Sequence, residues 1–258
     1  VTASFDINRY ELNVVANMNG FVIGSGTFAH GTHAIIAAKP QTGYEFAGWT
    51  GIGVADANST STTVTMTEDR NVTATFQPKI HTLTVTGGTG GNATGSGNFT
   101  HGITTNITAA PDLGHHFTGW SGTGTSDPIN PSTTVSMTEP RNITANFAIN
   151  RYQLNVAAET GGLAIGSGIF VHGTRATIAA APQTGYEFAR WNGDDVANAN
   201  AFVTTVDMTQ DRNISANFTP SQLVLAISTS TGGNTTGSGT YDYNSHVPIT
   251  AIPDTGYD

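Results

Sequence analysis

The chain has 258 residues, of which only 10% are charged; it carries a formal net charge of −9 and has no cysteine. This composition excludes disulfide frameworks and thiolate metal sites, and it lacks the basic patch that nucleic-acid binding requires. An acidic chain is repelled by anionic membrane surfaces, and no apolar run approaches the roughly 20 residues of a membrane span. We therefore expect no nucleic-acid partner and no membrane insertion in this segment.

A 71-residue period runs through the whole chain. The tryptophans keep this interval without insertion or deletion, and four other landmarks share it, namely the Phe series from Phe5, the Met series from Met66, the Pro series from Pro40 and the Gly-Ser-Gly triplets that begin at Gly24, Gly95, Gly166 and Gly237. A fixed period of this kind predicts a tandem repeat array. The predicted parts are the last strand of a preceding repeat (1–5), three whole repeats (9–76, 80–147 and 151–218) and a truncated fourth repeat (222–258), all within a longer repetitive protein.

Within one repeat, apolar residues alternate with the period of two that is typical of strands. In chain order, the first repeat offers strands at 10–15, around Phe28, around Ile36, at 63–66 and at 71–76, and the aromatic stretch 42–49 lies between the strand around Ile36 and the strand at 63–66. The Gly-Ser-Gly triplet inside a strand-like run predicts a bulge or a close backbone approach. The His-Gly pair after Phe28 predicts a hairpin turn with a positive φ at the glycine.

These patterns predict an all-β chain of small β-sandwich or β-grasp-like repeats, with five or six short strands each. Only four residues separate the last aromatic residue of one repeat from the first strand of the next. Such short linkers restrict the reachable orientations. We therefore expect a semi-rigid rod in which each repeat contacts mainly the neighbouring repeats of the same chain.

The aromatic stretch "TGYEFAGW" (42–49) recurs as "LGHHFTGW" and "TGYEFARW". A β-repeat this small needs large apolar side chains to build a core, which favours burial of one Trp and one Phe per repeat: Trp49, Trp120, Trp191, Phe76, Phe147 and Phe218. The position of Tyr44 varies among repeats, which indicates partial exposure. Tyr44 and its equivalents in the other repeats are the candidate contacts to glycans or partner proteins, namely Tyr44, His115, Tyr186 and Tyr257.

No catalytic pattern accompanies the repeat. The chain has no Ser/His/Asp order, no HExxH and no P-loop, so we expect no enzyme activity and no cofactor. The oxygen-rich loop 192–200 contains the calcium candidates Asp194, Asp195 and Asn198, but the other repeats do not reproduce this group. His101 is a turn residue, and the adjacent His115 and His116 should face opposite sides of a strand, so we expect no transition-metal site.

The sequences "GYEFAGW" and "TTVTMTEDRNVTATF" resemble the divergent internalin B-type repeat of bacterial surface and secreted proteins. The resemblance covers nearly the whole chain, in three full copies and one partial copy. It implies an extracellular all-β stalk or adhesive segment and carries over no catalytic residues. The alternatives are a carbohydrate-binding module array and the spacer of a secreted enzyme. The partners that we expect besides neighbouring repeats are other copies of the protein, joined through strand edges, and surface glycans.

Overall fold

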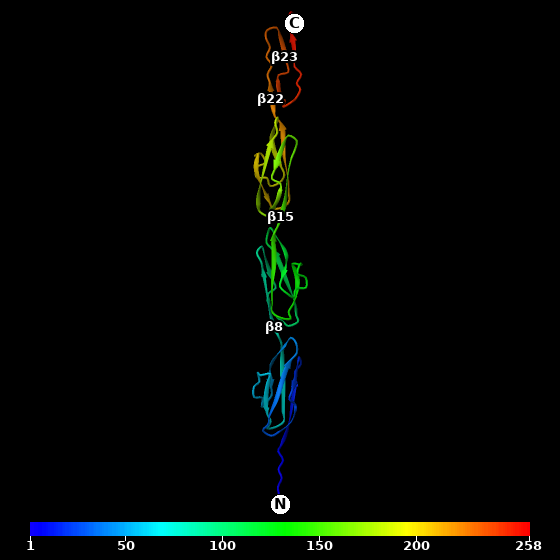
Figure 1. Ribbon diagram of the computed structural model, residues 1–258, viewed down its shortest axis with the longest axis vertical. Coiled ribbons are helices and arrows are strands. Elements are labelled where there is room, and N and C mark those ends of the chain that lie inside the picture. Colours follow the sequence, from blue (N-terminus) through cyan, green and yellow to red (C-terminus); the bar gives the residue numbers. More distant parts are fainter. The chain divides into compact units, whose positions relative to one another are not determined.

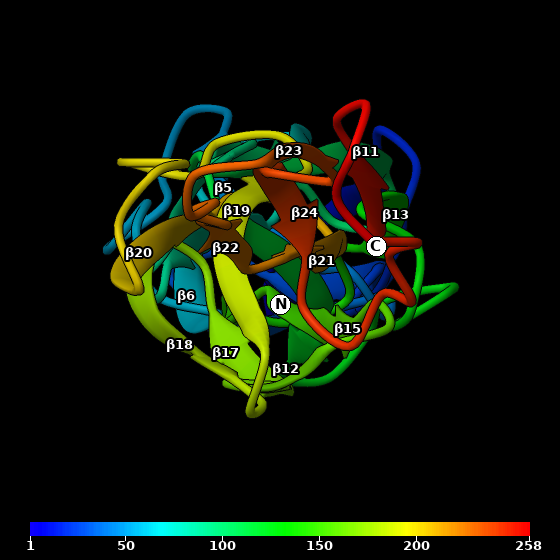
Figure 2. The ribbon, with the colours of Figure 1, turned by 90° about the horizontal axis from the view of Figure 1, so that it is seen from above.

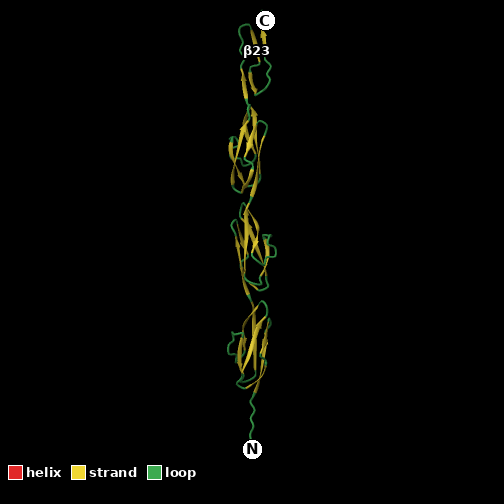
Figure 3. Cartoon of the chain, in the orientation of Figure 1, coloured by secondary structure: helices red, strands yellow, loops and turns green.

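The computed structural model describes residues 1–258 and contains strands and turns without any helix (Figures 1 and 3). It therefore has no helix that is long and apolar enough to cross a bilayer. The chain divides into two compact units, residues 1–111 with 117–147 and residues 112–116 with 148–258. The complete repeats share one architecture, and the first repeat illustrates it.

Seven strands build each complete repeat. In the first repeat they are β1 (Arg9–Ala16), β2 (Gly20–Ile23), β3 (Gly26–Ala29), β4 (His33–Pro40), β5 (Tyr44–Thr50), β6 (Ser61–Thr65) and β7 (Arg70–Pro78). The second repeat has β8 (Ile80–Gly87), β9 (Gly91–Thr94), β10 (Gly97–Thr100), β11 (Thr104–Pro111), β12 (His115–Ser121), β13 (Ser132–Ser136) and β14 (Arg141–Ile149). The third has β15 (Arg151–Ala158), β16 (Gly162–Ile165), β17 (Gly168–Val171), β18 (Thr174–Pro182), β19 (Tyr186–Asn192), β20 (Val203–Met208) and β21 (Arg212–Pro220).

Two sheets face each other in each complete repeat. The four-stranded sheet has the order β3-β1-β7-β5, and the three-stranded sheet has the order β2-β4-β6. Figure 2 labels strands of the two sheets of the third repeat, namely β15, β17, β19 and β21 of the four-stranded sheet and β18 and β20 of the three-stranded sheet. The first and last strands, β1 and β7, run parallel, from Leu12 opposite Arg70 to Ala16 opposite Ala74. The repeat is thus a β-sandwich, and no helix is present for a β-grasp arrangement.

The Gly-Ser-Gly triplet accounts for the difference from the five or six strands that the sequence predicted. It forms no bulge; it ends β2 in one sheet and starts β3 in the other, so one strand-like run becomes two strands. The backbone approach is close, because a Cβ on Gly24 would lie 2.6 Å from the carbonyl oxygen of Ile35. The Ser25 hydroxyl bonds to β1, accepting from the Val14 amide at 2.9 Å and donating to the Val14 carbonyl at 3.3 Å. The serine therefore replaces a ladder contact where the chain changes sheets.

The same serine contact occurs in every repeat. The equivalent pairs are Ser96 with Val85, Ser167 with Val156 and Ser238 with Ile227. The turn after β3 also recurs, with positive φ at Gly31, Gly102, Gly173 and Asn244. This confirms the predicted conformation of the His-Gly turn, in which glycine and asparagine are the residues that tolerate a positive φ.

Each complete repeat has its own core between its two sheets. The first core is formed by Leu12, Val14, Val72, Ala74, Phe76 and Trp49 from one sheet and Ala34, Ile36, Ala38, Val64 and Met66 from the other. The second and third clusters contain the equivalent residues within 83–145 and 154–216. A register shift between Phe46 and Gly48 lets Phe46 and Trp49 both face the core, although three positions separate them. The two rings then meet edge to face at 5.5 Å.

The two ends of the chain differ from the complete repeats. Residues 1–5, expected as the last strand of a preceding repeat, form no strand in the structure. Residues 222–258 form two sheets of two strands each, β22 (Gln222–Leu225) with β24 (Gly239–Asp242) and β23 (Gly233–Thr236) with β25 (Thr250–Pro253). Ile249 is 67% exposed, whereas its equivalent Ile36 is fully buried. The core therefore depends on the last three strands of the repeat.

Candidate functional site

The tryptophans lie inside the sandwiches. Trp49, Trp120 and Trp191 are 4%, 7% and 1% exposed. Each indole Nε1 donates a 2.9 Å hydrogen bond to a backbone carbonyl ten residues later, of Ser59, Asn130 and Ala201 respectively. A ring that is enclosed and hydrogen-bonded in this way has no free face for a sugar. Of the expected core phenylalanines, Phe76 is buried, and Phe147 and Phe218 are half-buried against their cores.

The candidate contact residues have different surroundings. Tyr44 is half-buried and packs against the first core. Tyr186 is also half-buried, and its ring leaves no space for a side chain at Gly161, where a Cβ would lie 2.3 Å from Tyr186 Cδ1. His115 is half-buried, and Tyr257 is 58% exposed. These four side chains stand at equivalent positions of different repeats, and the structure does not gather them into one site.

Two of the three calcium candidates in the acidic loop of the third repeat, Asp195 and Asn198, have partners within the protein. Asp195 pairs with the guanidinium of Arg212, whose side chain is only 6% exposed. The Asn198 side-chain oxygen accepts from the Asn200 amide at 3.0 Å. Asp194 is exposed beside them. The three calcium candidates therefore do not form a ligand cage, since Ca²⁺ takes about 6–8 oxygen ligands; Asp195 neutralises an arginine instead.

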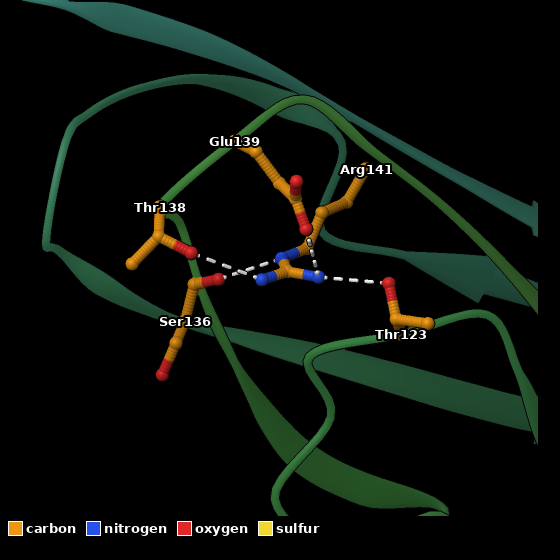
Figure 4. A network of polar contacts seen from close by, with 5 residues as sticks. All are labelled: Thr123, Ser136, Thr138, Glu139 and Arg141. Atoms are coloured by element: carbon orange, nitrogen blue, oxygen red, sulfur yellow. Dashed lines mark hydrogen bonds and ion pairs between the residues drawn. The ribbon is translucent and has the colours of Figure 1, made fainter.

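Sequence reasoning missed this arginine, although it also keeps the 71-residue interval, as Arg70, Arg141 and Arg212. Figure 4 shows the arrangement around Arg141, whose Nε donates to the Ser136 carbonyl at 2.8 Å. Its two terminal nitrogens donate to the hydroxyls of Thr123 and Thr138 at 2.8 and 3.1 Å, and Glu139 lies 3.2 Å away. A largely buried guanidinium thus joins the loop after β12 to the turn before β14.

The carboxylate that neutralises the arginine occupies two different positions among the repeats. Glu68 pairs with Arg70 and Glu139 with Arg141, from the turn two residues before the arginine. The third repeat has Gln210 at that position, and its carboxylate comes from Asp195, which stands where the first two repeats have Gly53 and Gly124. All three residues have a positive φ. Because aspartate tolerates this conformation better than most residues, the negative charge can move across the site without a change of backbone.

Successive repeats meet through a turn that contacts a short linker. In the first unit the Lys79 amide donates to the Gly43 carbonyl at 2.8 Å, and the His101 amide donates to the Lys79 carbonyl at 2.8 Å. The His101 ring lies over Gly43, where a Cβ would be 2.3 Å from Cδ2. The second unit repeats these bonds with Gly114, Asn150 and His172 and with Gly185, Ser221 and Tyr243. A glycine at this turn is therefore required by the aromatic ring above it.

Comparison with known families follows the same period. The family model of the divergent InlB B-repeat domain matches residues 10–80, 81–151, 152–222 and 223–258. The chain belongs to this family. Its InlB B-repeats follow one another without a gap, and this agrees with the resemblance seen in the sequence. A search of curated proteins finds no match to the chain.

Membership of the InlB B-repeat family suggests that the chain is a repeat region of a surface protein, and such repeat domains are generally non-catalytic. Within these InlB B-repeats, the residues that recur most strictly have packing tasks: the tryptophan fills the core, the serine bonds across the change of sheet, and the arginine joins two loops. The position above the glycine of the linker contact also recurs, but its residue type varies between His and Tyr.

Proposed function

We propose that this chain is a non-catalytic, extracellular structural segment of a bacterial surface protein, which spaces or attaches other parts and carries mechanical load. The observation that supports this proposal is the parallel pairing of the first and last strands in every complete repeat. Because β1 and β7 run in the same direction, the chain enters a repeat at one end of the sheet and leaves it at the other.

This arrangement determines how a repeat responds to tension. A pull on Arg9 and Pro78 loads the five paired residues of β1 and β7 in shear, so that their hydrogen bonds resist together. A pull on Arg9 and Ala29, which are directly opposite each other in an antiparallel pair, separates β1 from β3 one bond at a time. Shear should therefore require a larger force than unzipping of the same repeat.

Single-molecule force spectroscopy tests the proposal. The chain has no cysteine of its own, so handles can be attached through R9C with P78C or through R9C with A29C. We expect a clearly higher unfolding force for R9C/P78C than for R9C/A29C. Stretching of the full chain should give repeated steps, each releasing at most about 230–255 Å for 71 residues at roughly 3.3–3.6 Å per residue. Equal forces for the two pairs of handles would contradict a load-bearing role.

A carbohydrate-binding array is the function of another class that a binding experiment can distinguish. A glycan array with the full chain and with Y44A and Y186A should show no specific glycan whose binding depends on these tyrosines. Tyr44 is half-buried against the first core, and Tyr186 is half-buried beside Gly161 of its own repeat. Binding to one glycan class that both substitutions remove would favour the array over the spacer.

A further inference from the structure

The second repeat contains a pair of histidines that the sequence did not indicate as a site. His81 lies in β8, and His101 directly follows β10, which pairs antiparallel with β8. His81 Nε2 and His101 Nδ1 are 3.1 Å apart, and the ring centroids are separated by 5.3 Å. Both side chains are half-buried, so the pair remains open to solvent.

The separation of these nitrogens fits two ligands of one transition-metal ion. Imidazole nitrogens bind Zn²⁺ at about 2.0–2.1 Å. The two nitrogens are 3.1 Å apart. If one ion bound both at this bond length, the N–metal–N angle would be about 98°. This value lies between the right angle of square-planar or octahedral sites and the tetrahedral angle. An increase of about 0.25 Å in the N···N distance would give the tetrahedral angle.

The pocket around the two rings also contains a carboxylate, but the chain has no group of three side chains that could hold a metal ion together. Glu45 of the preceding repeat lines the same open pocket as His81 and His101, together with Lys79, so the pocket has no net charge before the imidazoles are counted. Gln77 donates to Glu45 at 2.7 Å. The lack of a side chain at Gly43 leaves space for the His101 ring, since a Cβ there would lie 2.3 Å from Cδ2. The Nδ1 atom of this ring lies 3.1 Å from His81 Nε2.

The pair is specific to the second repeat. The equivalents of His81 are Tyr10 in the first repeat and Tyr152 in the third, and each packs against the histidine of its own repeat, His30 at 5.8 Å and His172 at 6.0 Å between ring centroids. A tyrosine therefore fits this position structurally. Histidine at residue 81 keeps the ring contact, at 5.3 Å between centroids, and adds a second nitrogen donor.

We infer that His81 and His101 form a binding site for a borderline divalent transition-metal ion such as Zn²⁺, with water in the remaining positions. Imidazole ligands suit Zn²⁺, Cu²⁺ and Ni²⁺. In the free protein one of the facing nitrogens carries the proton of the hydrogen bond. Binding requires that this proton move to the other nitrogen of the same ring through solvent, after which both lone pairs point to the ion. Neutral rings thus bind without net proton release, and acid weakens binding because protons compete for the same nitrogens.

Isothermal titration of the full chain with Zn²⁺ at pH 7.5 tests the inference. We expect one saturable site per chain and, in H81Y, a loss of affinity of at least about tenfold, equivalent to about 1.4 kcal/mol. H81Y reproduces the Tyr–His pair of the first and third repeats, so it should fold like the parent chain. The matched control is H33Q, because His33 is exposed and bonds only to Thr65; this variant should bind Zn²⁺ like the parent.

Two-dimensional ¹H–¹⁵N spectra of the histidine rings should show Zn²⁺ at His81 Nε2 and His101 Nδ1. Absence of saturable binding would overturn the inference, and so would binding that H81Y leaves unchanged. A greater loss of Zn²⁺ affinity in H33Q than in H81Y would place the ion elsewhere and also overturn the inference. Chemical-shift changes confined to His115 and His116 would do the same.

Discussion

The carboxylate that pairs with the recurring arginine occupies different positions in different repeats, and two substitutions test whether these positions are equivalent. In the third repeat, D195N removes the negative charge beside Arg212 while asparagine keeps the size of the side chain and tolerates the positive φ at this position. A hydrogen bond to a charged group contributes roughly 1.5–3 kcal/mol. The Asp195 side chain is 52% exposed and that of Arg212 only 6%, so water replaces part of the lost interaction. We expect D195N to lower the free energy of unfolding of the third repeat by about 1–2 kcal/mol.

The second substitution should restore what the first removes. Q210E places a carboxylate where Glu68 and Glu139 pair with the arginines of the first and second repeats. The double variant D195N/Q210E therefore reproduces their charge arrangement, and its stability should return to within about 0.5 kcal/mol of the parent. In the parent background Q210E alone should have a smaller effect, because Arg212 already has a counter-ion.

Hydrogen exchange resolved by repeat is the suitable measurement. Amides of the loop 193–201 and of β20 should exchange faster in D195N and return to the parent rate in D195N/Q210E, while β6 of the first repeat stays unchanged as an internal control. A loss of about 1 kcal/mol should lower the midpoint of thermal unfolding of one repeat by about 4–8 °C. If D195N leaves exchange unchanged, or if Q210E fails to restore it, the charge pair does not hold this loop.

Three further predictions concern the recurring small residues. S96A removes both hydrogen bonds to Val85 and should cost about 1 kcal/mol, seen as faster exchange of the Val85 amide. G91A and G102A form a matched pair for thermal unfolding. A Cβ on Gly91 would lie 2.5 Å from Phe147 Cζ, so overpacking in G91A should cost about 1–3 kcal/mol. Gly102 has open space around it and only a positive φ, so G102A should cost about 1 kcal/mol, and equal costs would contradict the role of the phenylalanine. G43A should push the His101 ring away and speed exchange of the Lys79 amide while the exchange of the first core stays slow; unchanged exchange of Lys79 would show that the ring contact does not hold the linker.

The sequence predicted the structure correctly where a residue pattern has only one structural explanation. Alternation and the 71-residue period predicted the all-β repeats, and glycine or asparagine after His30 and its equivalents predicted the positive φ. Of the two interpretations of the Gly-Ser-Gly triplet, the close backbone approach is confirmed and the bulge is wrong. A change of sheet and a bulge both need small residues, and only the hydrogen bond between Ser25 and Val14 distinguishes them. The register shift before Trp49 breaks the period of two, so alternation alone would place this ring on the wrong face.

The candidate site shows the same limit. Asp195 was singled out for its oxygen-rich neighbours, whereas its partner Arg212 lies 17 residues away and becomes adjacent only in the folded sandwich. A comparison of residues 53, 124 and 195 with residues 68, 139 and 210 could have revealed the exchange of charge, since a carboxylate lost from one position appears at the other. His81 and His101 could not be paired from spacing, because their contact depends on the register of β8 with β10.

The position of the last strand also bears on how such a chain is made. β7 is the final strand of its repeat to leave the ribosome, yet it lies between β1 and β5 in the sheet. Until it emerges, both of these strands lack a shared neighbour, and the exposed Ile249 of residues 222–258 shows how much apolar surface then stays open. During synthesis each repeat therefore stays incomplete, with exposed apolar surface, until its own last strand emerges. A similar strand from the next repeat emerges 71 residues later, so rapid pairing with the correct strand protects the array from mispairing.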